Sequence, residues 1–204
     1  TILRGLLEHY SSDELKLILV DPKQTELIEF EESPYLERPL GFNASDAEES
    51  LEKCVVEMEK RYRLFKEASR THSKLVNSVK SFNKVAPANQ NLSWWVIVLD
   101  EYADLIINPD DKKKIEQLLS RLAAKARASG IHIIIATQKP TVEVINSVLR
   151  SNLPAQLALT VKSGNESRVI MDDLGAESLS GNGDAFLKIG GKLNRLQCAM
   201  VADD

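Results

Sequence analysis

The 204-residue chain is 43% apolar and 27% charged, with a formal net charge of −4, a composition typical of a globular protein with a sizeable core. Its apolar runs are far shorter than the roughly 18 residues of a membrane helix, and its 9 glycines and 7 prolines exclude a collagen-like chain. Cys54 and Cys198 lack the spacing of zinc or redox motifs. Because the first residue is Thr1 rather than Met, we expect a piece of a longer protein.

The charge is unevenly distributed along the chain. Residues 1–50 carry 4 basic and 12 acidic side chains, whereas residues 51–90 carry 9 basic and 4 acidic ones. The overall acidity gives no support for nucleic-acid binding. The basic stretch nevertheless leaves room for a local surface that faces DNA, and the acidic first stretch suits that role less.

The predicted elements alternate between helices and strands. Helices are predicted over 1–10, over 45–82 in one or two pieces, over 115–126 and over 141–150. Ser45 and Glu48 would form a capping box at the start of the second. Strands are predicted over 15–20, 95–99, 131–136, 157–161, 185–189 and 196–201, with a turn at Gly190-Gly191-Lys192. His132 alternates with apolar residues, so we expect it to lie in the core.

Apolar strands separated by helices indicate an α/β fold with a largely parallel sheet and helices on both faces. In such sheets, ligands bind beyond the carboxyl ends of the strands. The second strand runs directly into Asp100 and Glu101. In P-loop hydrolases, the first carboxylate of such a pair holds Mg²⁺ through its water shell and the second polarises the attacking water. We expect strand alternation to separate the two side chains, although a solvated turn leaves the same pattern.

Polar residues also follow the neighbouring strands. Thr137 and Gln138 place a hydroxyl and an amide where a γ-phosphate or its attacking water could be sensed, although a plain loop can be built from the same pair. Asp21 and Lys23 follow the first strand, where a turn fixed by Pro22 and a ligand role are both compatible with the sequence.

One expected part of a nucleotide site is absent from the sequence. A P-loop requires GxxxxGK[ST], whose backbone amides cradle the phosphates, and no such run occurs in the 204 residues. Either the nucleotide site is incomplete or the motif lies upstream of Thr1.

Several segments together resemble a known family. They are LILVDPKQTEL (17–27), WVIVLDEYADLI (95–106), SRLAAKARASGIHIIIATQKPTVEVI (120–145), SGNESRVIMD (163–172) and GAESLSGNGDAFL (175–187). In order and spacing they resemble the motor domain of the FtsK/SpoIIIE DNA translocases. The resemblance implies that residues 1–204 form one RecA-like P-loop ATPase domain, N-terminally truncated just after the Walker A motif.

The resemblance also implies roles for single residues. Asp100 resembles the Walker B aspartate that binds the nucleotide's Mg²⁺ through water, and Glu101 resembles the catalytic glutamate. Thr137 and Gln138 resemble the sensor at the end of the next strand, with Thr137 near the nucleotide and Gln138 taking part in catalysis. Arg127 resembles the arginine finger that reaches a neighbouring subunit's site, whereas the residues alone indicate only an exposed arginine near a helix end.

The function implied by the resemblance is an ATP-driven motor that assembles into a ring, expected to be a hexamer, and moves double-stranded DNA with ATP and Mg²⁺. This domain would be cytoplasmic without direct membrane contact, any membrane anchor lying upstream. Without a phosphate-binding loop, we expect the isolated 204 residues to be inactive. The alternatives are an ATPase of a secretion, conjugation or DptH-like DNA-restriction system, or a RecA-like interaction module.

Overall fold

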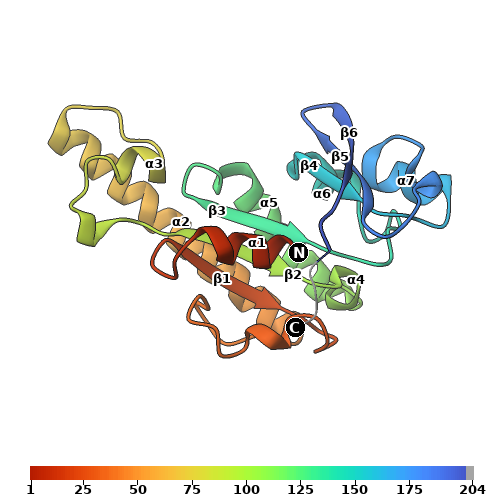
Figure 1. Ribbon diagram of the computed structural model, residues 1–204. Coiled ribbons are helices and arrows are strands. Elements are labelled where there is room, and N and C mark those ends of the chain that lie inside the picture. Colours follow the sequence, from red (N-terminus) through yellow and green to blue (C-terminus); the bar gives the residue numbers. More distant parts are fainter. Residues whose placement is uncertain (201–204) are drawn as a thin grey trace. The chain divides into compact units, whose positions relative to one another are not determined.

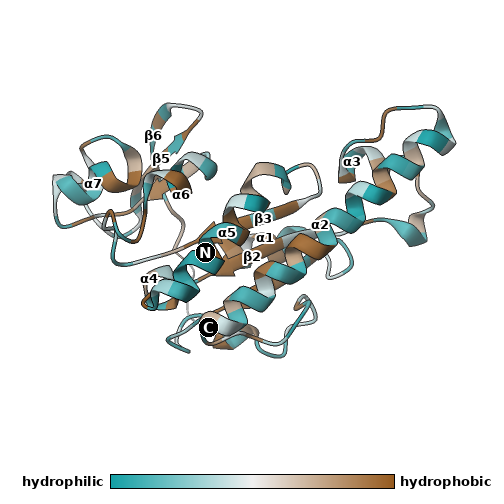
Figure 2. Cartoon of the chain, turned by 180° about the vertical axis from the view of Figure 1, so that it is seen from behind, coloured by the Kyte–Doolittle hydropathy of each residue, from teal (hydrophilic) through white to brown (hydrophobic). Residues whose placement is uncertain are grey.

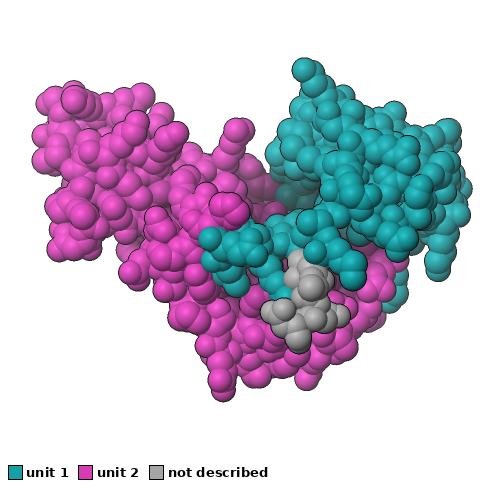
Figure 3. All heavy atoms as spheres, in the orientation of Figure 1, with its two compact units in different colours: residues 1–8, 139–204 teal, residues 9–138 magenta. Residues whose placement is uncertain are grey.

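The structure is a computed structural model that describes residues 1–200, and the chain divides into two compact units (Figures 1 and 3). Unit 1 comprises residues 1–8 and 139–204, and unit 2 comprises residues 9–138. The helices are α1 (Ile2–His9), α2 (Ala44–His72), α3 (Val79–Phe82), α4 (Tyr102–Leu105), α5 (Pro109–Lys125), α6 (Ser147–Asn152) and α7 (Gly164–Met171). The strands are β1 (Leu15–Val20), β2 (Trp94–Leu99), β3 (Ile131–Ile135), β4 (Ala155–Ala158), β5 (Asp184–Ile189) and β6 (Lys192–Gln197). Three short 3₁₀ turns are η1 (Ile28–Phe30), η2 (Ala88–Gln90) and η3 (Ala176–Ser178).

Unit 2 contains a parallel sheet in the order β1-β2-β3. All of β1 and β2 is buried except for one partly exposed residue in each, which is typical of strands covered on both faces, and the strands are among the most hydrophobic parts of the chain (Figure 2). The last residues of the strands, Val20, Leu99 and Ile135, are register partners. The residues that follow the three strands therefore meet at one edge of the sheet.

Helices α2 and α5 pack together beside this sheet. The side chain of Asn43 accepts the Asp46 N–H, so α2 begins at Ala44 and its cap lies two residues before the predicted Ser45. The predicted capping box is therefore wrong, because an Asx cap takes its place. The buried face of α2 recurs with helical spacing and contains Ala47, Leu51, Cys54, Val55, Met58 and Phe65. Similarly, α5 begins at an Asn108 cap with proline in its first turn.

A second hydrophobic cluster packs α3 against the outer part of α2. It comprises Phe65, Val76, Val79 and Phe82, with Tyr62, Leu92 and Trp94 among the partly buried residues around it. The chain reverses after α2 at Ser73, which has left-handed backbone angles. This cluster holds the segment 60–92 in place beside β2.

The turn between α5 and β3 is fixed by contacts from α2 and α3. Gly130 has a φ of 73°, and a Cβ there would lie 2.7 Å from Val79 Cγ2. The Arg61 guanidinium, 1% exposed, donates to the carbonyls of Ser93 and Ser129 at 2.8 and 2.7 Å. The backbone of this turn is therefore held in place, and so is the position from which each of its side chains extends.

Unit 1 contains an antiparallel sheet in the order β4-β5-β6. Gly190 and Gly191 have φ values of 58° and 78° and join β5 to β6 as the predicted turn. A two-residue turn of this kind requires antiparallel neighbours. The α/β class is confirmed, but of the six strands in residues 1–200 only β1, β2 and β3 are parallel. The predicted last strand begins four residues earlier than expected, and its end at Val201 lies outside the described residues.

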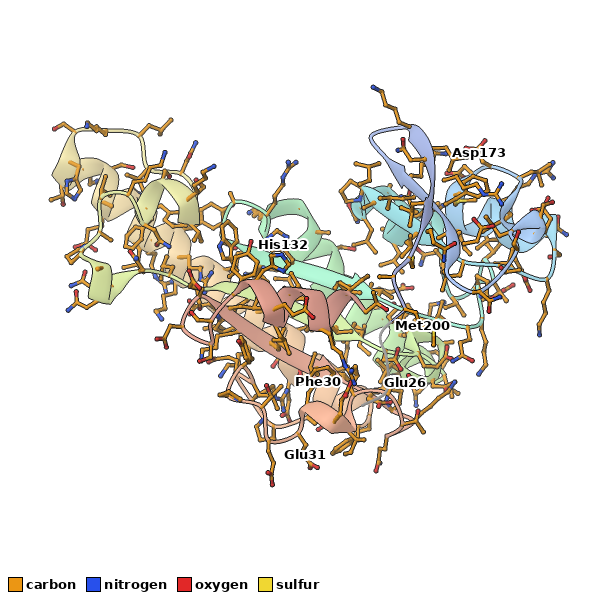
Figure 4. The ribbon with its side chains drawn as sticks, viewed as in Figure 1. Glu26, Phe30, Glu31, His132, Asp173 and Met200 are labelled. Atoms are coloured by element: carbon orange, nitrogen blue, oxygen red, sulfur yellow. The ribbon has the colours of Figure 1, made fainter. Side chains whose placement is uncertain are left out.

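The structure also bears on the expected burial of His132 and on the expected lack of a membrane helix. His132 lies on β3 with its ring centroid 5.7 Å from that of Trp94 (Figure 4), but the residue is exposed. Its predicted place in the core is wrong, because β3 pairs with β2 on one side only in the described sheet. Within residues 1–200, no helix is both long and apolar enough to cross a membrane.

Candidate active site at the carboxyl edge of the parallel sheet

Four of the predicted site residues lie at the carboxyl edge of the parallel sheet. Asp100 and Glu101 follow β2 directly, and Thr137 and Gln138 follow β3 after one intervening residue. β2 is the central strand of the three, so its carboxylates have neighbours on either side.

The backbone at Glu101 is unusual. Its φ of 37° and ψ of 60° are left-handed, a conformation that costs a residue other than glycine about 1–3 kcal/mol. The next N–H, from Tyr102, donates to the Ala136 carbonyl at 2.8 Å and ties this turn to the end of β3. Glu101 thus follows β2 in a left-handed turn, and the separation of the two side chains by strand alternation stays a prediction.

The Glu101 carboxylate is buried and contacts residues from both neighbouring strand ends. Its side chain is 1% exposed. Oε2 accepts from the Lys23 ammonium at 2.8 Å, whereas Oε1 accepts from the Thr137 hydroxyl at 2.8 Å and the Gln138 N–H at 3.2 Å. A single carboxylate therefore joins the ends of all three strands.

These contacts affect the charge of both Glu101 and Lys23. Burial raises the pKa of Glu101, but the hydrogen bonds from Lys23, Thr137 and Gln138 outweigh burial and bring it below its usual value. The hydrogen bond to Glu101 in turn raises the pKa of Lys23. Both groups are therefore charged at neutral pH. The sequence left the role of Lys23 undecided, and its position three residues beyond a strand that neighbours the strand of Glu101 was the available signal.

Asp100 differs from Glu101 in its surroundings. It is partly exposed, and its N–H donates to the Val20 carbonyl at 2.9 Å. Burial raises the pKa of Asp100, and the nearby charge of Asp21 raises it further. A bound cation would relieve both effects. No group of three or more histidine, cysteine or acidic side chains in residues 1–200 is arranged to hold a metal.

Asp21 takes a structural role. It is fully buried, and its carboxylate accepts five backbone N–H groups, from residues 23 to 27, at 2.9–3.0 Å. Burial raises the pKa of Asp21, but these hydrogen bonds outweigh burial and lower it overall. The carboxylate shapes the loop that carries Lys23 and Glu26 (Figure 4). The turn interpretation of the sequence thus holds for Asp21, whereas Lys23 reaches the site.

The fold does not bring Arg127 close to the other predicted site residues. It is exposed in the turn before β3, whereas Thr137 follows the other end of that strand. Five residues of strand span about 17 Å at roughly 3.3 Å each. Within one copy of the chain, Arg127 and Glu101 therefore lie at opposite ends of the sheet.

A model of the FtsK/SpoIIIE family matches residues 1–142. The chain belongs to the FtsK/SpoIIIE family. It is 41% identical over 188 residues to the DNA translocase FtsK of Borreliella burgdorferi, with 90% of the chain covered, and 41% identical over 209 residues to the DNA translocase SftA of Bacillus subtilis, with 100% covered. It spans only 23% and 21% of the lengths of these two relatives.

Solved structures agree with the family assignment in fold. The conjugation coupling protein TcpA, determined with ATPγS, superposes with a TM-score of 0.79 at 24% identity over 96% of this chain and 55% of its own. The ATPases 2 and 3 of EssC from Geobacillus thermodenitrificans superpose with a TM-score of 0.78 at 18% identity over 100% of this chain and 37% of theirs. These likenesses confirm the predicted P-loop ATPase fold. DNA translocases of the FtsK/SpoIIIE family are ATPases.

Proposed function

We propose that this chain is part of an ATP-driven motor that moves double-stranded DNA. The observation that carries the proposal is a buried Glu101 carboxylate, held by the Thr137 hydroxyl and the Gln138 N–H, directly after a partly exposed Asp100. A P-loop ATPase needs such a pair, one carboxylate for the metal and one for the water. The DNA translocase relatives at 41% identity support DNA as the cargo.

The chemistry assigns separate tasks to the two carboxylates. Asp100 would hold Mg²⁺ through its water shell, and the ion would supply charge neutralisation for the phosphates of ATP. Glu101 would accept hydrogen-bond donation from the attacking water and increase its nucleophilicity. Thr137 and Gln138 orient the Glu101 carboxylate, and the exposed Gln138 side chain is available to sense the γ-phosphate.

A ring would complete the site. We infer that Arg127 acts in the site of a neighbouring subunit, as an arginine fork that offsets charge on the transferred phosphoryl group. Its exposure at the end of the sheet opposite Glu101 supports action between subunits rather than within one. A hexamer is the expected assembly, and both compact units are proposed to belong to one ATPase domain, since the family match includes residues of each.

Duplex DNA is favoured over protein as the cargo. The secretion and conjugation proteins are less than 25% identical to this chain, so their similarity is evidence for a shared fold and not for a shared cargo. In addition, α2 presents a basic stripe formed by Arg63, Lys66 and Arg70, which are exposed and recur at helical spacing. Contacts of this kind to the phosphate backbone are independent of base sequence.

The hydrolytic part of the proposal is tested by Glu101→Gln in the whole protein that carries this chain. The substitution keeps the size of the side chain but removes the base. ATP turnover should fall by about 100-fold or more, while the dissociation constant for ATP, measured by isothermal titration, should stay within about twofold of wild type. Unchanged turnover would remove Glu101 from the mechanism.

The DNA part is tested separately on the basic stripe. The triple variant Arg63→Gln, Lys66→Gln, Arg70→Gln should weaken binding to duplexes of any sequence and reduce the slope of log K against log salt by about 2 to 3. A triple Gln variant of Lys112, Lys113 and Lys114 on α5 removes the same charge from another surface and should retain most of the slope. Equal losses in both variants would show that only net charge matters.

The isolated 204 residues are proposed to be inactive and cytoplasmic. Their sequence lacks a GxxxxGK[ST] run, so the phosphates would have no backbone cradle. The purified chain should show no ATP turnover above a Glu101→Gln control in a phosphate-release assay. Turnover that this substitution abolishes would overturn the expectation.

A further inference from the structure

Both oxygens of the Glu101 carboxylate accept hydrogen bonds from other residues, and these bonds hinder its action as a base. A base must offer an oxygen to the water that it polarises. Here Oε2 is held by the Lys23 ammonium, Oε1 accepts two donors, and the side chain is 1% exposed. An attacking water would have to compete with these donors for a buried oxygen.

Of the donors to Glu101, Lys23 is the one that can most readily release the carboxylate. Its N–H donates to Oδ1 of Asp21 at 3.0 Å, so its backbone belongs to the loop that Asp21 holds. Its side chain, by contrast, is 35% exposed and ends in a charge on a flexible stem. Asp104 on α4 and Asp100 also attract the ammonium. Lys23 could thus move from Glu101 to another carboxylate while the loop stays in place.

We propose that Lys23 is a positioning residue that keeps Glu101 withdrawn, and that ATP hydrolysis requires this ion pair to open. The proposal rests on the proposed function, because it assumes that Glu101 polarises the attacking water. It assigns to Lys23 the role of restraining turnover until the motor engages its cargo. In the engaged motor, the ammonium would leave Oε2 of Glu101, and Glu101 would be free to approach the water.

The surroundings of the pair support a restraint rather than a phosphate contact. The Lys23 ammonium lies 2.8 Å from Oε2 of Glu101, an oxygen that an attacking water would need. The other groups facing the pair are the carboxylates of Asp100 and Asp104, together with the uncharged donors Thr137 and Gln138. Removing Lys23 should therefore leave Oε2 open to the water.

The test compares ATP turnover with and without duplex DNA in the whole protein. Lys23→Met removes the ammonium but keeps the length of the side chain, and Lys23→Arg retains a charged donor. We expect Lys23→Met to raise DNA-free turnover by about three- to tenfold, as for the loss of a hydrogen bond of ordinary net strength, since the lysine side of the pair is exposed to solvent. DNA-saturated turnover and the dissociation constant for ATP should change by less than about twofold, and Lys23→Arg should keep the wild-type ratio of the two rates.

The ratio of DNA-free to DNA-saturated turnover is a readout that a structural role would not move, because a structural defect lowers both rates together. The matched control is Lys16→Met on β1, the strand that precedes Lys23, since Lys16 donates to the Pro34 carbonyl at 3.4 Å and lies near the other end of β1. It should leave both rates unchanged.

The remaining outcomes each decide the question. Unchanged or reduced DNA-free turnover in Lys23→Met would overturn the restraint, and reduced turnover with weaker ATP binding would identify Lys23 as a phosphate contact instead. If Lys23→Met does not fold, Lys23→Gln, which keeps a neutral donor, replaces it with the same expected direction. Glu101→Gln assayed in parallel separates the failures: if it abolishes turnover while Lys23→Met has no effect, only this inference falls.

Discussion

The Thr137 hydroxyl donates a hydrogen bond to Oε1 of Glu101 at 2.8 Å, from the end of β3 to the end of β2. The Tyr102 N–H donates in the other direction, to the Ala136 carbonyl, so the two strand ends are joined twice. A shift of one strand end would consequently move the carboxylate that is proposed to act on water.

Thr137→Val should lower ATP turnover of the whole protein by about tenfold, because it removes one donor from a proposed catalytic carboxylate at constant volume. Thr137→Ser keeps the hydroxyl and should retain most of the activity. Steady-state turnover at saturating ATP and DNA measures both. Equal activity of the valine and serine variants would show that the hydroxyl is dispensable.

Arg127→Ala should abolish turnover of the assembled ring if the guanidinium acts on a neighbouring site. Mixing this variant with Glu101→Gln subunits should restore part of the activity, because some interfaces then combine an intact Arg127 with an intact Glu101. The measurement is turnover against mixing ratio. A strictly additive curve, with no recovery at any ratio, would contradict action between subunits.

Asp21→Asn should destabilise the protein by about 2–4 kcal/mol. The buried carboxylate accepts five backbone N–H groups, and the amide that replaces it would point its own N–H groups at some of these donors. The pKa of Asp21 is lowered in the folded state, so its contribution is present above the unfolded-state pKa of about 4 and is lost as the pH falls.

Urea unfolding at several pH values tests this assignment. The wild type should lose stability from about pH 5 downwards, and Asp21→Asn should lose less over the same range. Asp13→Asn, on an exposed residue, serves as the control. An Asp21→Asn variant as stable as wild type at pH 7 would show that the loop does not depend on the carboxylate.

Tyr102→Phe should leave the free energy of unfolding unchanged or raise it by up to about 1 kcal/mol. The side chain is fully buried, and among the described residues its hydroxyl has no hydrogen-bond partner. Tyr62→Phe is the matched control, since its hydroxyl donates to the Lys125 carbonyl at 2.7 Å, and it should cost about 0.5–1 kcal/mol. A larger loss in Tyr102→Phe than in the control would reveal a contact for the buried hydroxyl.

Much of the fold could be predicted because its signals are local. Continuous apolar runs at β1 and β2 and the 3.6-residue period of α2 depend only on neighbouring residues. The turn at Gly190 and Gly191 was also read from sequence. The antiparallel arrangement of the last three strands was missed, because strand direction depends on connections that apolar runs do not record.

The sequence by itself determined the class of the protein, its family likeness and the residues that follow each strand, since these depend on residue order. Only the tertiary structure decided that Lys23 pairs with Glu101 while Asp21 holds the loop beneath it. Both residues follow the same strand, but the Asp21 carboxylate accepts N–H groups from its own loop, whereas the contact of Lys23 with Glu101 arises only when the strand ends meet. The physical reason is that a buried charge is satisfied by whichever donors the fold brings within reach.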